Sequence, residues 1–166
     1  MRLKKGCSGI WIAALATIAD RITKAIVLSA NARRLALSST DSSVLWKWPG
    51  VAALRYAENT GMAFSLFSGS GTALTIFTLL LVSGLAGYLI SKPEMPKAMR
   101  AGFWLIIGGG MGNLFDRLVY GHVIDFIEVL FVRFAVFNLA DAFICIGAAV
   151  VAIAALIDER KKELHP

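Results

Sequence analysis

Two aspartates, Asp125 and Asp141, flank a short segment that is able to turn back on itself, Phe126–Ala140. If such a turn brings the two carboxyl groups together, desolvation and like-charge repulsion raise one pKa, so the pair holds a single proton. That arrangement suits amide hydrolysis, because the ionised carboxylate takes a proton from water while the protonated one polarises the carbonyl. Nearby asparagines would orient the carboxylates or hold the backbone of a substrate.

A purely structural role is the alternative for the same residues. Asp141 would then pair with Arg117 or Lys24 and hold helices together, and the adjacent Asp116 and Arg117 would form a charge pair at a helix end. Asp20 and Lys24 are i,i+4 neighbours on a predicted helix, so they are expected to form an ion pair.

The energetics favour a functional role for Asp141. A charged side chain at membrane depth costs roughly 2.5–3.5 kcal/mol on insertion scales, whereas a typical interhelical hydrogen bond contributes only about 0.6 kcal/mol. Two other classes remain open, a proton-coupled transporter and a membrane assembly factor. A transporter would need acids spread through the membrane, but the apolar stretch Thr72–Ser91 contains none.

The composition indicates an integral membrane protein. Of the 166 residues, 57% are hydrophobic and 17% are charged, against about 25% charged in typical soluble domains. The net charge of +6 lies in short clusters beside apolar runs, which is typical of lipid headgroup anchoring rather than nucleic-acid binding. Cys7 and Cys145 predict no disulfide, and two distant histidines offer no metal-ligand spacing, so no cofactor is expected.

The hydropathy pattern predicts one integral membrane domain over residues 1–166, an all-α bundle of four transmembrane helices with a small extracytoplasmic β-rich insert. The first apolar segment also resembles a cleavable signal peptide, but charged residues interrupt it and further spans follow. The insert, at about residues 31–66, has β-prone residues around a Pro-Gly turn and tryptophans suited to the headgroup zone. The helices are expected at about 8–30, 72–91, 101–116 and 134–157.

The distribution of Lys and Arg predicts that both termini are cytoplasmic, since nine basic residues fall in the two tails and the middle turn. This orientation brings most of the polar residues within the apolar sequence to one level, toward the outer half of the membrane: Asp20, Asn59, Asn113, Asp116, Arg117, Asp125, Asn138 and Asp141.

Five motifs together resemble the bacterial lipoprotein signal peptidases (signal peptidase II), and the similarity covers about residues 10–157. In chain order the motifs are Asp20-Arg-Ile-Thr-Lys24, Asn59-Thr-Gly-Met-Ala-Phe-Ser65, Gly108-Gly-Gly-Met-Gly-Asn-Leu-Phe-Asp-Arg117, Val123-Ile-Asp-Phe126 and Phe137-Asn-Leu-Ala-Asp141.

The resemblance implies an intramembrane aspartyl endopeptidase of the bacterial inner membrane, with its active site near the periplasmic side. Asp125 and Asp141 match the catalytic dyad. The family cleaves prolipoproteins before a cysteine carrying diacylglycerol, needs no metal and is inhibited by globomycin. A β-cradle and a short periplasmic helix lie over its site. Matches to supporting polar positions are Asn59, Asn113, Arg117, Asn138, Asp20 and Lys24.

Small residues near the motifs are expected to leave room for the substrate before the scissile bond, namely Gly61, Ala63 and Gly109. The chain departs from the family pattern at Met62 and Ala142, where the family has a small residue and a serine, and both changes bear on inhibitor binding. His122 resembles a family-typical neighbour of the dyad, although its role is expected to be structural.

Overall fold

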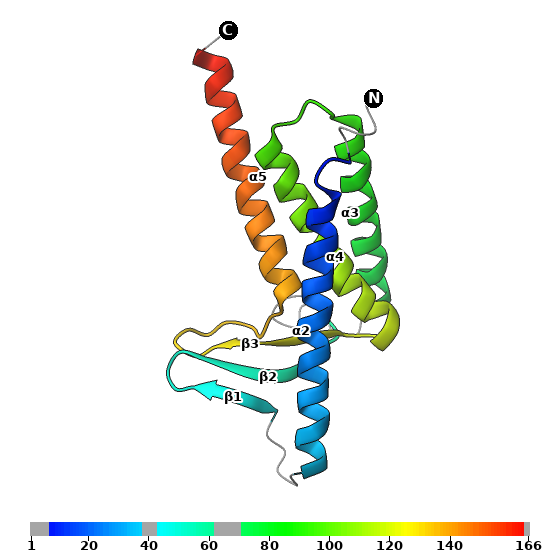
Figure 1. Ribbon diagram of the computed structural model, residues 1–166, viewed down its shortest axis with the longest axis vertical. Helices are drawn as coiled ribbons and strands as arrows, with labels where there is room; N and C mark the ends of the chain where they lie inside the picture. Colours follow the sequence, from blue (N-terminus) through cyan, green and yellow to red (C-terminus); the bar gives the residue numbers. More distant parts are fainter. Residues whose placement is uncertain (1–6, 38–42, 62–70, 165–166) are drawn as a thin grey trace.

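The computed structural model describes residues 7–37, 43–61 and 71–164, which form four long helices and one three-stranded sheet (Figure 1). The helices are α2 (Ile10–Leu37), α3 (Gly71–Ser91), α4 (Lys97–Tyr120) and α5 (Leu139–Leu164), and the strands are β1 (Val44–Trp48), β2 (Ala52–Asn59) and β3 (Val123–Val129). The helices run side by side, and the sheet projects sideways from the lower end of the bundle in this view.

Helix α4 lies at the centre of the bundle and contacts each of the other three helices. Its consecutive glycines explain how, because neighbouring positions on a helix point about 100° apart. A Cβ atom on Gly108 would meet α2 at Ala13, one on Gly109 would meet the Ala140 carbonyl of α5, and one on Gly110 would meet Val82 of α3. Close helix approach without side chains is typical of membrane bundles.

The inner face of α2 combines small, charged and apolar residues at helical spacing. Its buried positions recur every three or four residues and are Ala13, Ala16, Asp20, Lys24 and Val27. The two alanines lie against α4, whereas Val27 packs with Ile124 and Phe126 of β3. One helix therefore holds both the bundle and the sheet.

The sheet is antiparallel with the order β1-β2-β3. Ala57 of β2 lies opposite Asp125 of β3, and Asn59 lies opposite Val123. Since residues paired across a sheet share a face and faces alternate along a strand, Asn59 and Asp125 point to the same side. Ile124 and Phe126 take the other side, where they pack on α2.

Several boundaries differ from the sequence prediction. Residues 31–37 continue α2 instead of belonging to the β-rich insert, and the third strand, β3, comes from the chain after α4. The last helix begins at Leu139 rather than near residue 134, because Phe137 pairs with Ile127 of β3. The short periplasmic helix that the resemblance implies is absent from residues 46–61, which form β1, β2 and their turn; residues 62–70 lie outside the described part of the chain.

Among the described helices, α3 and α5 are long and apolar enough to cross a membrane by length and composition. Helices α2 and α4 are also long, with 28 and 24 residues, but charged residues are buried in both, Asp20 and Lys24 in α2 and Arg100 and Asp116 in α4. The fold is therefore mostly helical with a small antiparallel sheet, and the count of four membrane crossings stays a prediction.

Candidate active site

Asp125 and Asp141 come together because the chain between them reverses direction, as the sequence predicted. Asp125 lies in β3, and Asp141 lies in the first turn of α5. The reversal is closed by backbone hydrogen bonds: Ile127 N–H donates to the Phe137 carbonyl at 2.8 Å, and Phe137 N–H donates to the Ile127 carbonyl at 3.0 Å. Asp141 therefore starts its helix beside the strand that carries Asp125.

Asn138, which is fully buried, contacts both aspartates. Its side-chain amide donates to Asp125 Oδ1 at 2.7 Å, and its Oδ1 accepts from the Asp141 N–H at 3.0 Å. In return, the Asn138 backbone N–H donates to Asp141 Oδ2 at 3.2 Å. The reciprocal pair is a capping box, with Asn138 at the N-cap and Asp141 three residues later. The same contacts begin α5 and fix Asp141 beside Asp125.

Two further asparagines complete the shell of donors around the carboxylates. Asn59 Nδ2 donates to Asp125 Oδ2 at 2.9 Å, while its Oδ1 accepts from the Gly61 N–H at 3.0 Å. Asn113 Nδ2 donates to Asp141 Oδ1 at 2.8 Å. Asn138 also donates to Asn113 Oδ1 at 3.1 Å. The three predicted asparagines are thus brought to the dyad by β2, α4 and the start of α5.

The environment of Asp125 favours its protonated form. Burial, the largest cause, and the nearby charge of Asp141 together raise the pKa of Asp125 to about 6, against the hydrogen bonds from Asn59 and Asn138, which lower it. The side chain is only 2% exposed. A buried carboxyl beside a second carboxyl is the arrangement that holds one proton between two groups.

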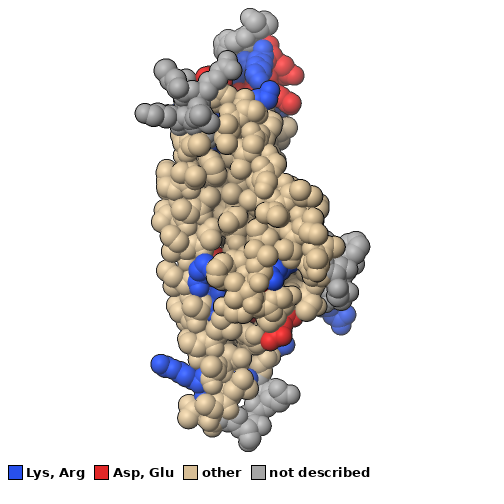
Figure 2. All heavy atoms as spheres, turned by 90° about the vertical axis from the view of Figure 1, so that its right-hand side faces the viewer, with Lys and Arg blue, Asp and Glu red and all other residues tan. Residues whose placement is uncertain are grey.

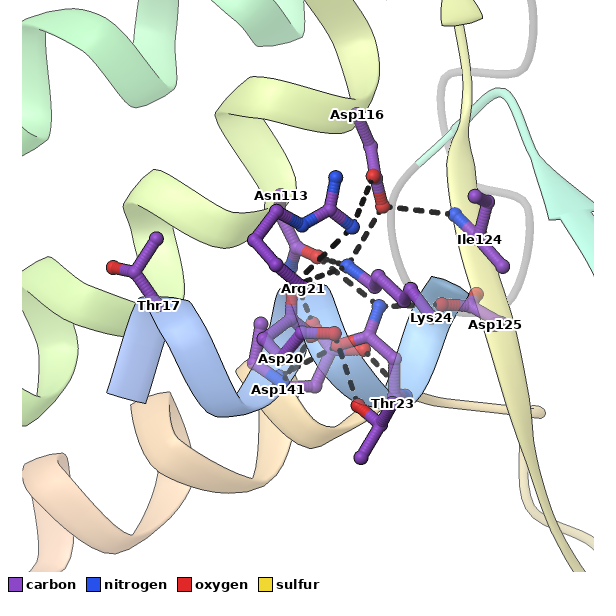
Figure 3. A network of polar contacts seen from close by, with 12 residues as sticks. Thr17, Asp20, Arg21, Thr23, Lys24, Asn113, Asp116, Ile124, Asp125 and Asp141 are labelled. Carbon is purple, nitrogen blue, oxygen red and sulfur yellow. Dashed lines mark hydrogen bonds and ion pairs between the residues drawn. The ribbon is translucent and has the colours of Figure 1, made fainter. Parts of the chain in front are cut away.

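A second polar network lies next to the dyad, between α2 and α4 (Figure 3). The predicted pair of Asp20 and Lys24 is present, with 3.0 Å between Oδ2 and Nζ. Lys24 also lies 2.7 Å from Asp116 Oδ2, and Arg21 lies 2.6 Å from Asp116 Oδ1. Lys24 Nζ then donates to Asn113 Oδ1 at 3.0 Å, which connects this network to the dyad.

The predicted charge pair between Asp116 and Arg117 is wrong. Asp116 pairs with Arg21 and Lys24 of α2, not with the adjacent Arg117. The guanidinium of Arg117 instead lies 3.5 Å from the Gly61 carbonyl. In the described part of the chain, no ion pair joins Asp141 to Arg117 or Lys24, the partners expected for a structural role; Asp141 instead accepts a hydrogen bond from Asn113 of α4.

Two hollows reach the dyad from different sides. A groove of about 210 Å³ between α3, α4 and α5 is mostly apolar and ends at the polar residues Asn113, Arg117 and Asp141. A larger cavity of about 710 Å³ lies along β2, β3 and the following turn, and includes Asn59, Gly61 and Asp125 in its lining. The site is therefore open to a chain approaching between helices and to groups approaching over the sheet.

The expectation that Gly109 leaves room for substrate is wrong. A Cβ atom there would run into the Ala140 carbonyl and lie 2.8 Å from Ile144, so Gly109 serves the contact of α4 with α5. The neighbouring Gly110 lines the groove instead. His122 contacts Glu58, with 3.9 Å between Nδ1 and Oε2, in agreement with a structural role. Met62 and Ala63 lie outside the described residues.

The sequence matches the family model for signal peptidase (SPase) II over residues 12–157. A lipoprotein signal peptidase from Gloeobacter violaceus is 39% identical over 152 residues, covering 91% of this chain and 83% of the relative. One from Mesorhizobium japonicum is 48% identical over 113 residues, covering 66% and 67%. A bacterial membrane enzyme structure determined in meso at 2.3 Å resolution superposes with a TM-score of 0.78 and 28% identity, covering 93% of this chain and 91% of that one.

These findings define a membrane peptidase with a small sheet at one end of a helical bundle. The chain belongs to the signal peptidase II family, whose members remove the signal peptides of prolipoproteins.

Proposed function

We propose that this peptidase is of the aspartic type, with Asp125 and Asp141 as its catalytic pair, and that it cleaves diacylglyceryl-modified prolipoproteins just before the lipidated cysteine. The observation that carries the proposal is that one residue, Asn138, donates hydrogen bonds to both carboxyl groups. Asn138 contacts Asp125 through its amide and Asp141 through its carbonyl and backbone, inside one buried network. Two buried carboxyl groups that share Asn138, and whose charges act on one another, are suited to hold one proton between them.

The reaction then follows from the proton on the pair. The ionised aspartate takes a proton from a water molecule, whose oxygen attacks the scissile carbonyl, while the protonated aspartate donates to the developing oxyanion. The resulting diol collapses as the leaving nitrogen receives a proton from the pair. Asn59 donates a hydrogen bond to Asp125, and Asn113 donates one to Asp141. These bonds fix the orientation of each carboxylate toward the attacking water. No metal ion is needed for these steps.

The two hollows support a division of the substrate between bilayer and water. The apolar groove, with Leu74, Phe77, Leu81 and Val82 in its lining, suits the signal peptide or the diacylglyceryl group. Arg117, at its polar end and 3.5 Å from the Gly61 carbonyl, is placed to bind the substrate backbone. The cavity over the sheet suits the chain that continues beyond the cysteine, and it gives water a route to Asp125.

We further propose that all four helices cross the bacterial inner membrane, with the site near the periplasmic side. Figure 2 shows a broad face without charged side chains between the charged upper end and the lower half of the molecule. In Figure 1 the turn after α3 and the end of α5 share the upper end, and both carry Lys or Arg. The positive-inside rule assigns that end to the cytoplasm.

The test is cleavage of a diacylglyceryl-modified peptide by purified protein, with and without globomycin. Asp125→Asn and Asp141→Asn are each expected to fold and to lose at least about 100-fold in turnover, since each removes half of the acid–base pair. Asp158→Asn is the matched control, because it removes a carboxylate that pairs with Lys162 near the end of α5, outside the network of the dyad. Globomycin is expected to inhibit the unmodified enzyme. Substantial cleavage by either dyad variant would contradict the proposal.

A further inference from the structure

The network centred on Lys24 is more extensive than an ion pair that joins two helices. Each of its two carboxylates accepts a backbone N–H from the residue immediately before a dyad aspartate. Asp116 Oδ2 accepts from Ile124 N–H at 3.2 Å, and Asp20 Oδ1 accepts from Ala140 N–H at 3.1 Å. Ile124 precedes Asp125, and Ala140 precedes Asp141.

Lys24 holds these two carboxylates in one place. Its ammonium lies 3.0 Å from Asp20 Oδ2 and 2.7 Å from Asp116 Oδ2, and it is only 1% exposed. The backbone before each dyad residue is therefore tied to the same buried cation, although β3 and α5 belong to different parts of the fold. Figure 3 shows Lys24 between Asp116 and the Asp20 side of the network.

Lys24 also fixes the direction of an amide. An ammonium can only donate hydrogen bonds, so Asn113 must turn its Oδ1 toward Lys24 and its NH₂ group away. That NH₂ group donates to Asp141 Oδ1 at 2.8 Å. Asn138 also donates to Asn113 Oδ1, at 3.1 Å, so Lys24 is one of the two donors that hold the amide in this direction, and its removal weakens that hold.

The packing around Asp20 indicates that its position is defined closely. A Cβ atom on Gly112 of α4 would lie 2.5 Å from Asp20 Oδ2, so only glycine leaves room for this carboxylate. Both Asp20 and Asp116 are fully buried. The network has two negative charges, on Asp20 and Asp116, and Lys24 balances one of them. Arg21 balances the other, with its guanidinium 2.6 Å from Asp116 Oδ1 and 4.6 Å from the centre of the Phe115 ring.

We infer that Asp20, Lys24 and Asp116 are positioning residues for the peptidase reaction: through two backbone amides and the Asn113 side chain they set the separation and orientation of Asp125 and Asp141. This inference rests on the proposed function, because it takes those two residues as the catalytic pair. It predicts that damage to the network lowers the rate of the chemical step even where the protein stays folded and binds its substrate.

The test compares two disruptive variants with one structural control. Asp116→Asn removes one carboxylate, and the double variant Lys24→Met with Asp116→Asn removes one charge of each sign, so that Asp20 and Arg21 are left balanced. Thr17→Val is the control, because Thr17 joins α2 to α4 one turn away by donating to the Gly108 carbonyl at 3.0 Å, without contact to the network.

The kinetic readout separates positioning from stability. For a diacylglyceryl-modified peptide, kcat of both disruptive variants is expected to fall by about 10-fold to 100-fold, because sub-ångström displacement of reacting groups costs rate, while KM changes by less than about threefold. Thr17→Val is expected to lower the melting temperature but to keep kcat. Deuterium exchange is expected to rise at Ile124 in both variants before it rises elsewhere.

Normal kcat in either folded network variant would overturn the inference. Loss of folding in both variants, with Thr17→Val folded, would assign the network to stability alone and overturn it as well. Asp125→Asn is included to separate the two claims. If that variant cleaves the peptide, the proposed function fails, whereas an inactive Asp125→Asn beside fully active network variants removes only the inference.

Discussion

Asn138 performs two tasks that separate residues perform in most proteins. Its Oδ1 caps α5 by accepting the Asp141 N–H, and its Nδ2 donates to Asp125 Oδ1. Helix initiation and the geometry of the dyad are therefore coupled at one side chain. Because a serine also caps helices but is too short to reach Asp125, substitution can separate the two tasks.

Asn138→Ala is expected to lower the free energy of unfolding by about 1–3 kcal/mol, through loss of the cap and of buried hydrogen bonds. Asn138→Ser is expected to recover about 1 kcal/mol of this by restoring the cap. Both variants should lose at least about tenfold in kcat, since neither can donate to Asp125. Thermal unfolding and peptide cleavage measure the two effects, and full activity of the serine variant would contradict the coupling.

The raised pKa of Asp125 also predicts how stability depends on pH. Its folded-state pKa of about 6 lies above the ordinary value of 3.8, so the folded protein binds this proton more tightly than the unfolded chain. The stabilising contribution is complete below about pH 4 and is lost as the pH rises through about 6. An amide side chain does not ionise in this range, so Asp125→Asn removes the titration of this group and its charge from the pair with Asp141.

Between pH 4 and pH 7, the unmodified protein is therefore expected to lose about 2 kcal/mol of stability relative to Asp125→Asn. Melting temperatures of both proteins in the same detergent, measured across that range, give the difference directly. Parallel curves for the two proteins would mean that Asp125 is not desolvated in the way the structure describes.

The sequence predicted residue contacts only where spacing decides them. Asp20 and Lys24 are i,i+4 on one helix, and they pair as expected. Asp116 and Arg117 are adjacent, but adjacent helical side chains point about 100° apart. Asp116 therefore faces α2, while Arg117 faces Gly61 and the groove. Finding the partner of Asp116 required knowing which helix packs on that face of α4.

At the scale of elements, the glycine run of α4 determines how the bundle is assembled. Gly108 faces α2, Gly109 faces α5 and Gly110 faces α3, so each glycine belongs to a different interface. The sequence predicted close helix packing from these glycines, but it assigned Gly109 to the substrate path. Its three-dimensional neighbour, the Ala140 carbonyl, lies directly before Asp141 in the chain.

Gly109→Ala is therefore expected to reduce stability and activity together, because the new methyl group forces α5 away from α4 at the residue before Asp141. We expect a loss of about 1–3 kcal/mol, as for overpacked cores, and at least about tenfold in kcat. Gly84→Ala on α3 is the matched control. In the described part of the chain, nothing outside the backbone of its own helix lies within 4 Å of its added Cβ, so it is expected to be neutral or slightly stabilising.

The strand β3 was not predicted from the sequence. Val123–Val129 is a short apolar run interrupted by Asp125 and Glu128, and such a run does not distinguish a strand from a buried loop. Its partner β2 ends at Asn59, far away in the chain, and α3 and α4 lie between them. The close approach of Asn59 and Asp125 followed from family resemblance, and local pattern alone did not predict it.

At the scale of the whole molecule, the residues of the polar site lie on β2, β3, α4 and the start of α5, and Figure 1 shows these strands beside that end of α5. Three of the buried charged residues of α2 and α4 lie toward that end, namely Asp20, Lys24 and Asp116, whereas the buried Arg100 lies near the start of α4, at the other end. The molecule is thus asymmetric along its long axis, with chemistry at one end and basic clusters at the other. This asymmetry makes its orientation in the membrane directly testable.

We expect the sheet to face the periplasm and the turn between α3 and α4 to face the cytoplasm. The natural thiols are Cys7 and Cys145, so Cys7→Ser with Cys145→Ala gives a background free of cysteine. Into it, Lys47→Cys places one thiol on β1, and Lys97→Cys places one at the start of α4; both lysines are exposed.

A membrane-impermeant maleimide should label Lys47→Cys in cells with a permeabilised outer membrane, and Lys97→Cys only after the inner membrane is opened. The positive-inside rule sets this expectation, because the turn and the end of α5 carry the basic clusters. The reverse labelling pattern would place the dyad on the cytoplasmic side, where a peptidase acting on exported prolipoproteins would not meet its cleavage site.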